Sequence, residues 1–223
     1  MAQLITGLDP ERVSANVAAV RAEIAAAAAR AGRDADEVQL LAAVKYLPAE
    51  ELGALAQAGV TLVGENRAQE LVHKVAVAGE RFTWDFIGAL QSRRVRLIVP
   101  HVRLIHSLAS ESALEQLARH MDRARPGLGV LIEVNVAGEA GKSGIAPADL
   151  DSFIERSPAP VRGLMTMPPL VSDPEASRPW FAALRELAGA RGLRELSMGM
   201  TQDFTVAVEE GATIVRIGTK LYE

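Results

Sequence analysis

The chain opens with a segment in which apolar residues recur at helical spacing. They lie three or four positions apart and so share one face: Val13, Val17, Val20 and Ile24. Asp9 suits the N-cap of this helix, Pro10 suits its first turn, and Gly32 suits its end. The pattern predicts an N-terminal helix within residues 1–34, with its apolar face packed on the rest of the protein.

From residue 38 onward, short apolar or β-branched runs alternate with amphipathic stretches. Eight runs have the composition of strands: 38–45, 61–66, 82–88, 103–109, 130–136, 161–167, 194–200 and 213–219. Several intervening stretches have helical periodicity: 48–59, 110–124, 176–190 and 203–211. This alternation is typical of parallel strands joined by crossover helices. We therefore predict an α/β fold, a single (β/α)8 barrel of the TIM type with an extra N-terminal helix, and the alternative is an open doubly wound sheet.

Composition narrows the class of protein further. Of the 223 residues, 49% are hydrophobic but only 4% are aromatic, which favours packed helices over an all-β sandwich. The net charge of −4 shows no basic excess of the kind that nucleic-acid binding requires. The absence of cysteine excludes disulfides and thiolate chemistry, and the four histidines lack metal-ligand spacing. Since neither a secretory signal nor a long apolar run is visible, we expect a cytoplasmic protein with no membrane partner, no metal and one domain, 1–223.

A barrel of this type places its active site at the carboxyl ends of the strands. Lys45 ends the first predicted strand, two positions after the small residue Ala43. An amine in apolar surroundings has a lowered pKa, which exposes the lone pair that imine formation needs. The alternative is a lysine that only ends a strand and extends into water.

Phosphate often binds such barrels after strands seven and eight. Thr201 follows strand seven, where its hydroxyl fits either an anion site at the next helix or an ordinary N-cap. In strand eight Arg216 needs an acceptor, because both faces of a barrel strand are covered, and either the structural carboxylate Glu133 or a ligand would serve. Gly218 and Thr219 follow, and they offer a close backbone approach and a hydroxyl.

Seven motifs occur in an order that identifies a family. They are AVKY (43–46), VGENRAQE (63–70), WDFIGALQSRR (84–94), GKSGI (141–145), RGLMTMPP (162–169), SMGMTQD (197–203) and VRIGT (215–219). With them the chain resembles the pyridoxal phosphate homeostasis protein family over nearly its whole length from about residue 38. The resemblance implies a barrel like the N-terminal domain of bacterial alanine racemase that binds pyridoxal 5′-phosphate (PLP).

The resemblance also implies roles for individual residues. Lys45 would form the internal aldimine with PLP, and Arg216 would face the pyridine nitrogen. The phosphate would be held by Thr201, Gly218 and Thr219, with backbone help from Ile217. The matching motifs further place four residues around the cofactor or its entrance: Asn66, Met165, Met200 and Lys142.

Two positions depart from the family pattern. The family commonly has histidine in the motif WHFIG, whereas this chain has Asp85, so any role of that histidine is absent here. Serine usually follows SMGM, and in this chain Thr201 supplies the hydroxyl instead. Phosphate binding should survive that exchange.

The residue opposite the pyridine nitrogen bears on function. An arginine is not deprotonated and donates to an unprotonated ring nitrogen, so PLP becomes a weaker electron sink than it would be beside a carboxylic acid. Racemisation needs two bases, and Lys45 is the only evident one, since we expect no second domain after the barrel. We therefore expect a monomeric carrier that holds PLP as a lysine aldimine for vitamin B6 homeostasis and supplies PLP-dependent apoenzymes. The alternatives are a racemase-like PLP enzyme acting on amino acids and a Schiff-base lysine enzyme acting on phosphorylated sugars.

Overall fold

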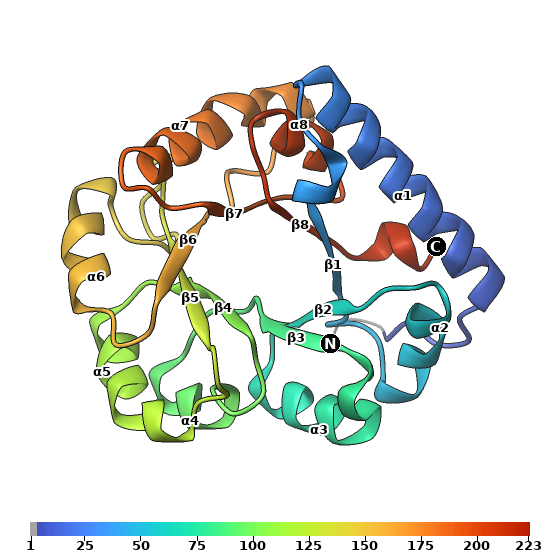
Figure 1. Ribbon diagram of the computed structural model, residues 1–223, viewed down its shortest axis with the longest axis horizontal. Coiled ribbons are helices and arrows are strands. Elements are labelled where there is room, and N and C mark those ends of the chain that lie inside the picture. Colours follow the sequence, from blue (N-terminus) through green and yellow to red (C-terminus); the bar gives the residue numbers. More distant parts are fainter. Residues whose placement is uncertain (1–3) are drawn as a thin grey trace.

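The computed structural model describes residues 4–223, in which eight parallel strands close into a barrel (Figure 1). The strands are β1 (Gln39–Ala43), β2 (Leu62–Glu65), β3 (Thr83–Phe86), β4 (Leu104–Leu108), β5 (Gly129–Glu133), β6 (Val161–Met165), β7 (Glu195–Met200) and β8 (Ile214–Ile217). They follow one another round the barrel in chain order, and β8 pairs with β1 to close it. Each strand overlaps one predicted run, so the predicted (β/α)8 barrel is confirmed and the open doubly wound sheet is wrong.

Helices surround the strands on the outside of the barrel (Figure 1). They are α1 (Pro10–Arg30), α2 (Leu52–Gln57), α3 (Ala68–Ala78), α4 (Val95–Ile98), α5 (Glu111–His120), α6 (Leu150–Arg156), α7 (Arg178–Gly189) and α8 (Phe204–Glu209). Within residues 4–223, none of these helices has the length and apolar character that crossing a membrane requires.

Helix α1 precedes the barrel and packs along its outside, beside α8 and α2 (Figure 1). It begins as predicted, since the side chain of Asp9 accepts a hydrogen bond from the backbone N–H of Glu11 and Pro10 occupies the first turn. The apolar positions of the sequence pattern are buried in its interface: Val13, Val17, Val20 and Ile24. The extra N-terminal helix is therefore confirmed.

Alternate residues of the strands point into the barrel, as the period of a β-strand requires. Part of the interior is an apolar cluster, formed by Leu41, Leu62, Leu104, Leu131, Met165 and Ile214. Inward positions also carry buried polar side chains: Asp85, His106, Glu133, Ser197 and Arg216. A buried polar group is unfavourable unless it finds a hydrogen-bond partner, so these side chains have to be explained by their contacts.

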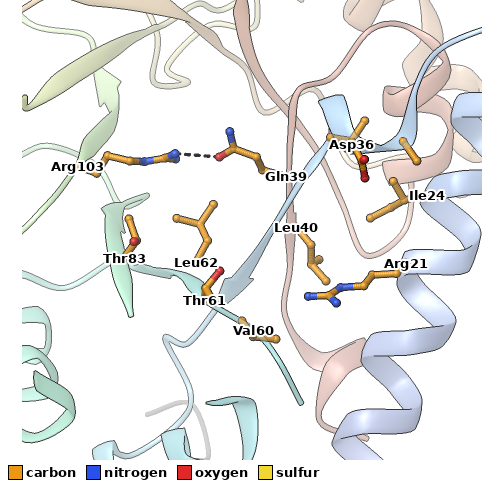
Figure 2. Close-up of a pocket in the computed structure, with 12 residues that line it drawn as sticks. Arg21, Ile24, Asp36, Gln39, Leu40, Val60, Thr61, Leu62, Thr83 and Arg103 are labelled. Carbon is orange, nitrogen blue, oxygen red and sulfur yellow. Dashed lines mark hydrogen bonds between the residues drawn. The ribbon is translucent and has the colours of Figure 1, made fainter. Parts of the chain in front are cut away.

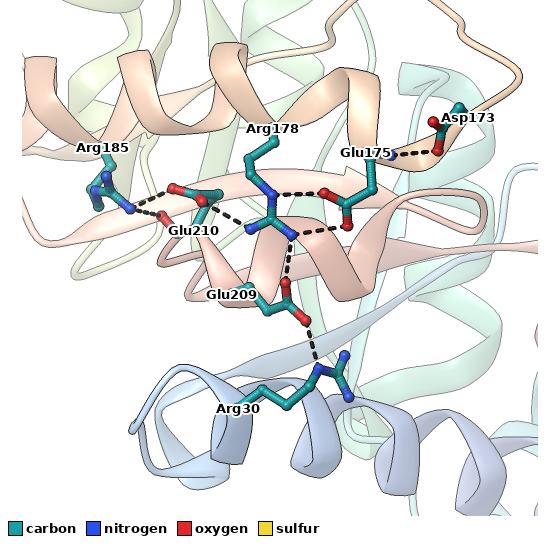
Figure 3. Close-up of polar contacts among 7 residues, drawn as sticks. All are labelled: Arg30, Asp173, Glu175, Arg178, Arg185, Glu209 and Glu210. Carbon is teal, nitrogen blue, oxygen red and sulfur yellow. Dashed lines mark hydrogen bonds and ion pairs between the residues drawn. The ribbon is translucent and has the colours of Figure 1, made fainter.

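An ion-pair network attaches α8 to its neighbours on the outside of the barrel (Figure 3). Arg178, at the start of α7, donates hydrogen bonds to Glu175, Glu209 and Glu210. Glu209 also accepts from Arg30 at the end of α1, at 2.7 Å. Because Glu209 and Glu210 lie at the end of α8, the network holds α8 against both α1 and α7.

Candidate functional site

A cavity of about 460 Å³ opens at the carboxyl ends of the strands, where the fold predicts a site. Seven of the residues predicted from the sequence line it: Lys45, Asn66, Met200, Thr201, Arg216, Gly218 and Thr219. They come from the ends of β1, β2, β7 and β8 and from the loops that follow. The fold thus brings together residues as far apart in the chain as Lys45 and Thr219, which are separated by 174 positions.

Three predicted residues do not line this cavity. Met165 points into the barrel, where it packs in the apolar cluster with Leu41 and Leu131, and Met167 contributes to the cavity wall instead. The side chain of Ile217 belongs to the core outside the barrel strands. Lys142 lies in the loop after β5, where its partly exposed side chain pairs with Glu139.

The cavity is also lined by six residues that were not singled out from the sequence: Tyr46, Ile87, Gly88, Ala89, Met167 and Gln202. Each lies inside one of the motifs quoted above, so the motifs held the signal for all of them. Met167 has the same inward phase as Met165 but comes two positions later, beyond the end of β6. The period of a strand defines its inward face, but it does not show which inward residue reaches the mouth of the barrel.

The backbone that leads to Lys45 is held by two buried side chains. The ammonium of Lys74 donates to the carbonyl of Val44 at 2.7 Å, and the hydroxyl of Tyr222 donates to the carbonyl of Ala43 at 3.0 Å. Burial raises the pKa of the Tyr222 hydroxyl, which therefore keeps its proton for this bond. The backbone before Lys45 is thus fixed by groups from α3 and from the end of the chain.

The amine of Lys45 is left available to the cavity. Its Nζ lies 4.9 Å from the centroid of the Tyr46 ring, a cation–π distance. Among the described residues, no carboxylate forms an ion pair with it. An amine without a carboxylate partner can react with an electrophile in the cavity once it has lost its proton.

Asn66 and Gly88 form the adjacent wall. A Cβ atom on Gly88 would lie 2.2 Å from the backbone oxygen of Asn66, so only glycine permits this contact between the ends of β2 and β3. The Oδ1 atom of Asn66 is buried and has no hydrogen-bond donor among residues 4–223. A ligand hydroxyl in the cavity would supply the missing donor.

Arg216 is buried at the base of the cavity and bonds to oxygens that carry no formal charge. Its Nη1 donates to the backbone oxygen of Ser197 at 2.9 Å and to the Ser197 hydroxyl, and its Nη2 donates to the backbone oxygen of Thr166 at 3.1 Å. Burial lowers the pKa of Arg216 to about 10, so the guanidinium stays charged at neutral pH. A guanidinium has more N–H donors than these three contacts use, which leaves donors for a ligand acceptor.

The structural carboxylate considered for Arg216 is not its direct partner. The ion pairs among residues 4–223 include none between Arg216 and Glu133, and Oε2 of Glu133 accepts from the hydroxyl of Ser143 at 3.0 Å instead. Burial raises the pKa of Glu133. Arg216 is therefore satisfied only in part by the protein.

Thr201 and Thr219, which carry hydroxyl groups, line the same cavity together with Gly218. The N-cap position of α8 is occupied by Asp203, not by Thr201, so the interpretation of Thr201 as an N-cap is wrong. The carboxylate of Asp203 accepts from the backbone N–H of Met200 at 2.8 Å and from the hydroxyl of Ser177 at 3.2 Å. Because Asp203 closes this turn, Thr201 is left at the cavity wall.

The charge of the cavity favours an anion. Its charged lining residues are Lys45 and Arg216, and none of the lining residues among 4–223 is acidic. No cluster of three His, Cys, Asp or Glu side chains able to hold a metal ion occurs within the same residues. The arrangement can hold an anionic ligand and react with it through one amine.

A second cavity, of about 540 Å³, lies at the opposite end of the barrel (Figure 2). Gln39, Leu62 and Thr83, the first residues of β1, β2 and β3, contribute to its lining, together with Arg21 of α1. Arg103 extends into its wall and donates to Gln39 at 2.9 Å (Figure 2). None of the residues predicted to bind a cofactor lies there.

Comparisons with known proteins agree with the geometry. The family model for the N-terminal domain of alanine racemase matches residues 15–223. The pyridoxal phosphate homeostasis protein of Aquifex aeolicus is 41% identical over 204 residues, which cover 86% of this chain and 90% of that protein.

Solved structures of related proteins have the same fold as this chain. PipY of Synechococcus elongatus, solved with PLP bound, superposes with a TM-score of 0.78 at 31% identity and covers 95% of this chain and 100% of its own. Alanine racemase of Corynebacterium glutamicum shares the fold at 15% identity, with a TM-score of 0.65 over 99% of this chain and 63% of its own. The chain belongs to the pyridoxal phosphate homeostasis protein family, which is built on the alanine racemase N-terminal domain.

Proposed function

We propose that this protein binds PLP covalently and reversibly through Lys45 and serves vitamin B6 homeostasis as a PLP carrier, without substantial catalysis. The observation that carries the proposal is one cavity that joins the amine of Lys45, the guanidinium of Arg216 and the hydroxyls of Thr201 and Thr219. The names of the relatives and the PLP bound to PipY support it.

The residues of the cavity fit the functional groups of PLP one by one. When bound, PLP supplies an aldehyde that condenses reversibly with an amine, together with a ring nitrogen, a ring hydroxyl and a phosphate. Lys45 provides the amine and Arg216 the spare N–H donors, while Asn66 provides an unsatisfied acceptor. Thr201 and Thr219 provide hydroxyl donors for the phosphate, and the cavity volume is in the range of small-molecule sites.

Arg216 sets the electronic character that the site would impose. Its pKa of about 10 keeps it charged at neutral pH, so it donates to a ring nitrogen and does not protonate it. A pyridine nitrogen that accepts a hydrogen bond withdraws fewer electrons than a protonated one. This favours storage of the aldehyde over reactions at the α-carbon of an amino acid.

The set of proton-transferring groups also favours a carrier. Of the lining residues among 4–223, only Lys45, Tyr46 and Arg216 are titratable, and Tyr46 turns its ring face towards the Lys45 amine. Racemisation requires proton transfer on both faces of a substrate, and neither a histidine nor a carboxylate is in place to provide it. Tyr46 is the one candidate for a second base in the racemase-like alternative.

The binding proposal is tested with borohydride and a visible spectrum. The purified protein should be yellow, borohydride should fix the cofactor to the peptide that contains Lys45, and Lys45→Ala should lose both properties while it stays folded. Lys142→Ala is the matched control, because this lysine lies outside the cavity and should leave the label at Lys45. A label on other lysines alone would refute the assignment, and a colourless protein with a bound sugar phosphate would support the phosphorylated-sugar alternative.

The absence of substantial turnover is tested separately with alanine in deuterated buffer. Exchange at the α-carbon needs only one base and is the most sensitive probe, and we expect it to be slow, with racemisation slower still. Racemisation at about 1 s⁻¹ or more would replace the carrier with the racemase-like enzyme. In that case Tyr46→Phe should abolish it. In cells, a deletion strain should show altered B6 vitamer pools and not the loss of one reaction.

A further inference from the structure

A continuous chain of hydrogen bonds runs through the barrel interior to Arg216. The Ser197 hydroxyl, which accepts from Arg216, lies 2.8 Å from Nδ1 of His106. Nε2 of His106 lies 3.1 Å from Oδ2 of Asp85. Arg103 closes the chain, since its Nε and Nη2 donate to the two oxygens of Asp85 at 3.1 and 2.7 Å.

The side chains of this hydrogen-bond network are buried except for Arg103 at one end of it. His106, Ser197 and Asp85 are fully or almost fully buried, and Arg103 is partly exposed in the wall of the cavity at the amino ends of the strands (Figure 2). The chain therefore links one end of the barrel with the cavity at the other. Its middle members lie out of reach of a ligand, and only Arg216 lines the cavity of the candidate site.

Chemistry allows one consistent direction for the hydrogen bonds. A carboxylate only accepts, so Asp85 accepts from the Nε2–H of His106, and Nδ1 of a neutral imidazole is then an acceptor. Nδ1 accepts a hydrogen bond from the Ser197 hydroxyl, so the lone pairs of the Ser197 oxygen face Arg216. Every bond then points the same way, from Arg216 to Asp85, an arrangement in which each bond polarises the next.

The charges around His106 agree with the neutral form. Burial lowers the pKa of His106, and the nearby Arg216 and Arg103 lower it further against the opposing effect of Asp85. Burial alone would raise the pKa of Asp85, but the contacts with His106 and Arg103 outweigh it and hold the pKa below the ordinary value. Asp85 is thus an anion at neutral pH and His106 is not a cation.

We propose that Asp85, His106 and Ser197 are positioning residues that fix the guanidinium of Arg216, so that its spare N–H donors face the ligand cavity. The proposal rests on the function proposed above, since it concerns how Arg216 meets the ring nitrogen. Ser197 binds Nη1 through two oxygens, which sets the plane of the guanidinium together with the Thr166 carbonyl on Nη2. Asp85 does not touch Arg216. It acts on Arg216 through His106 and Ser197, because its hydrogen bond selects the His106 tautomer.

The proposal gives a role to Asp85, one of the two positions at which this protein departs from the family pattern. A neutral histidine at position 85 could either donate to His106 or accept from it, whereas an aspartate only accepts. The charge of Asp85 is compensated by Arg103, which lies directly before β4. The pair of Asp85 and Arg103 therefore determines which nitrogen of His106 carries the proton.

The test uses the full-length protein with two readouts. In the protein without PLP, the ¹⁵N shifts of the His106 ring should show the Nε2–H tautomer, and Asp85→Asn should change the tautomer or mix the two. For the protein with PLP, Ser197→Ala should weaken PLP binding about fivefold, the effect of about one hydrogen bond, and shift the absorption maximum of bound PLP. Thr166→Val is the matched control, because it removes a hydroxyl that is equally buried and bonds to Val134 but keeps the carbonyl that Arg216 uses.

A double-mutant cycle separates positioning from a general effect on stability. If Ser197 acts through Arg216, then Ser197→Ala should have no further effect on PLP binding in an Arg216→Lys background. Equal effects of Ser197→Ala in both backgrounds, or a His106 ring protonated at Nδ1 in the wild type, would overturn the proposal. If the wild type itself fails to bind PLP, the proposed function fails instead, and the tautomer measurement still decides the hydrogen-bond direction.

Discussion

The ammonium of Lys74 and the carboxylate of Glu65 form a fully buried ion pair behind the candidate site. Lys74 also donates to the carbonyl of Val44, and Oε1 of Glu65 accepts from the backbone N–H groups of Asn66 and Arg67 at 2.7 and 3.1 Å. The pair therefore ties the backbone beside Lys45, the Asn66 loop and helix α3 to one another. A cofactor site needs this kind of support, because its side chains are only as well placed as the backbone beneath them.

Loss of one partner of this pair should destabilise the protein strongly. Lys74→Met leaves the Glu65 carboxylate buried without its counter-charge, and we expect the free energy of unfolding in urea to fall by about 3–5 kcal/mol. Lys74→Met combined with Glu65→Gln should lose less, since glutamine keeps an oxygen for the N–H groups of Asn66 and Arg67. The control is Lys220→Met, which breaks a partly exposed pair with Glu23 and should lose about 0–1 kcal/mol. A Lys74→Met variant as stable as this control would contradict the expectation.

The two threonines should contribute to binding of the phosphate group. Thr201→Ala or Thr219→Val should each weaken PLP binding by ~0.5–1.5 kcal/mol for a neutral hydrogen bond, or ~1.5–3 kcal/mol where the acceptor is charged. Pyridoxal, which lacks the phosphate, should bind the wild type much more weakly and be insensitive to both changes. Equilibrium dialysis with the two vitamers measures this, with Thr83→Val in the opposite cavity as the control. Equal affinity for PLP and pyridoxal would place the phosphate elsewhere.

Stability should decrease in mild acid through His106. Its pKa in the folded protein is lowered from 6.5, so at mildly acidic pH the unfolded chain binds a proton at His106 more readily than the folded protein does. Protonation of His106 therefore favours unfolding. The groups that face it are Asp85 of β3, Arg103 before β4 and Arg216 of β8. We expect the free energy of unfolding to fall as the pH drops below about 7.5, through the ordinary pKa of 6.5 and on towards the lowered pKa of the folded state, and His106→Gln to remove much of this slope.

The control for this pH dependence is His101→Gln, because the pKa of His101 is also lowered by burial but the residue is only partly buried. It should change the slope less than His106→Gln does. A slope that is the same in the wild type and in His106→Gln would mean that the His106 ring has the same pKa in the folded and unfolded states.

The network around Arg178 should hold α8 in place (Figure 3). Arg178→Ala removes the cation shared by Glu175, Glu209 and Glu210. Glu209 and Glu210 keep one cation each, Arg30 and Arg185, but no ion pair within residues 4–223 then joins α8 to Glu175. We expect a loss of about 1 kcal/mol or more in unfolding free energy, and faster hydrogen exchange in α8 at low salt, with both effects reduced by added salt. Arg156→Ala, which removes a cation that pairs with one carboxylate, Glu111, should have the smaller effect.

Much of the fold can be predicted from the sequence, because strand and helix patterns are local. The face of α1 that carries Val13 and Val17 is buried because its spacing matches the helical period, and this holds whatever the neighbour is. Strand period also placed Lys45 near the carboxyl end of β1, but the predicted strand was two residues too long, since β1 ends at Ala43 and Lys45 lies in the turn that follows. Strand position singled out Arg216 and Thr201 in the same way, and both line the same cavity as Lys45.

The position of each inward side chain along the barrel axis was decided only by the tertiary structure, as were the contacts that it makes across the barrel. Met165 and Met167 have the same phase in the sequence, but the position of β6 within the barrel places only Met167 at the cavity. Strand pairing and tilt fix that position, and they depend on the whole barrel.

The buried polar contacts show more clearly that a local sequence pattern does not reveal contacts between distant residues. His106 and Ser197 are 91 positions apart, and no periodicity links them, yet closure of the barrel brings their side chains within 2.8 Å. Lys74 shares the buried face of α3 with Leu71, where an apolar residue is expected, and only the folded chain supplies Glu65 and the Val44 carbonyl to its ammonium. The sequence determined which residues turn inward, whereas the partners of the polar ones depend on long-range packing, since a buried charge is stable only where the finished fold provides its counterpart.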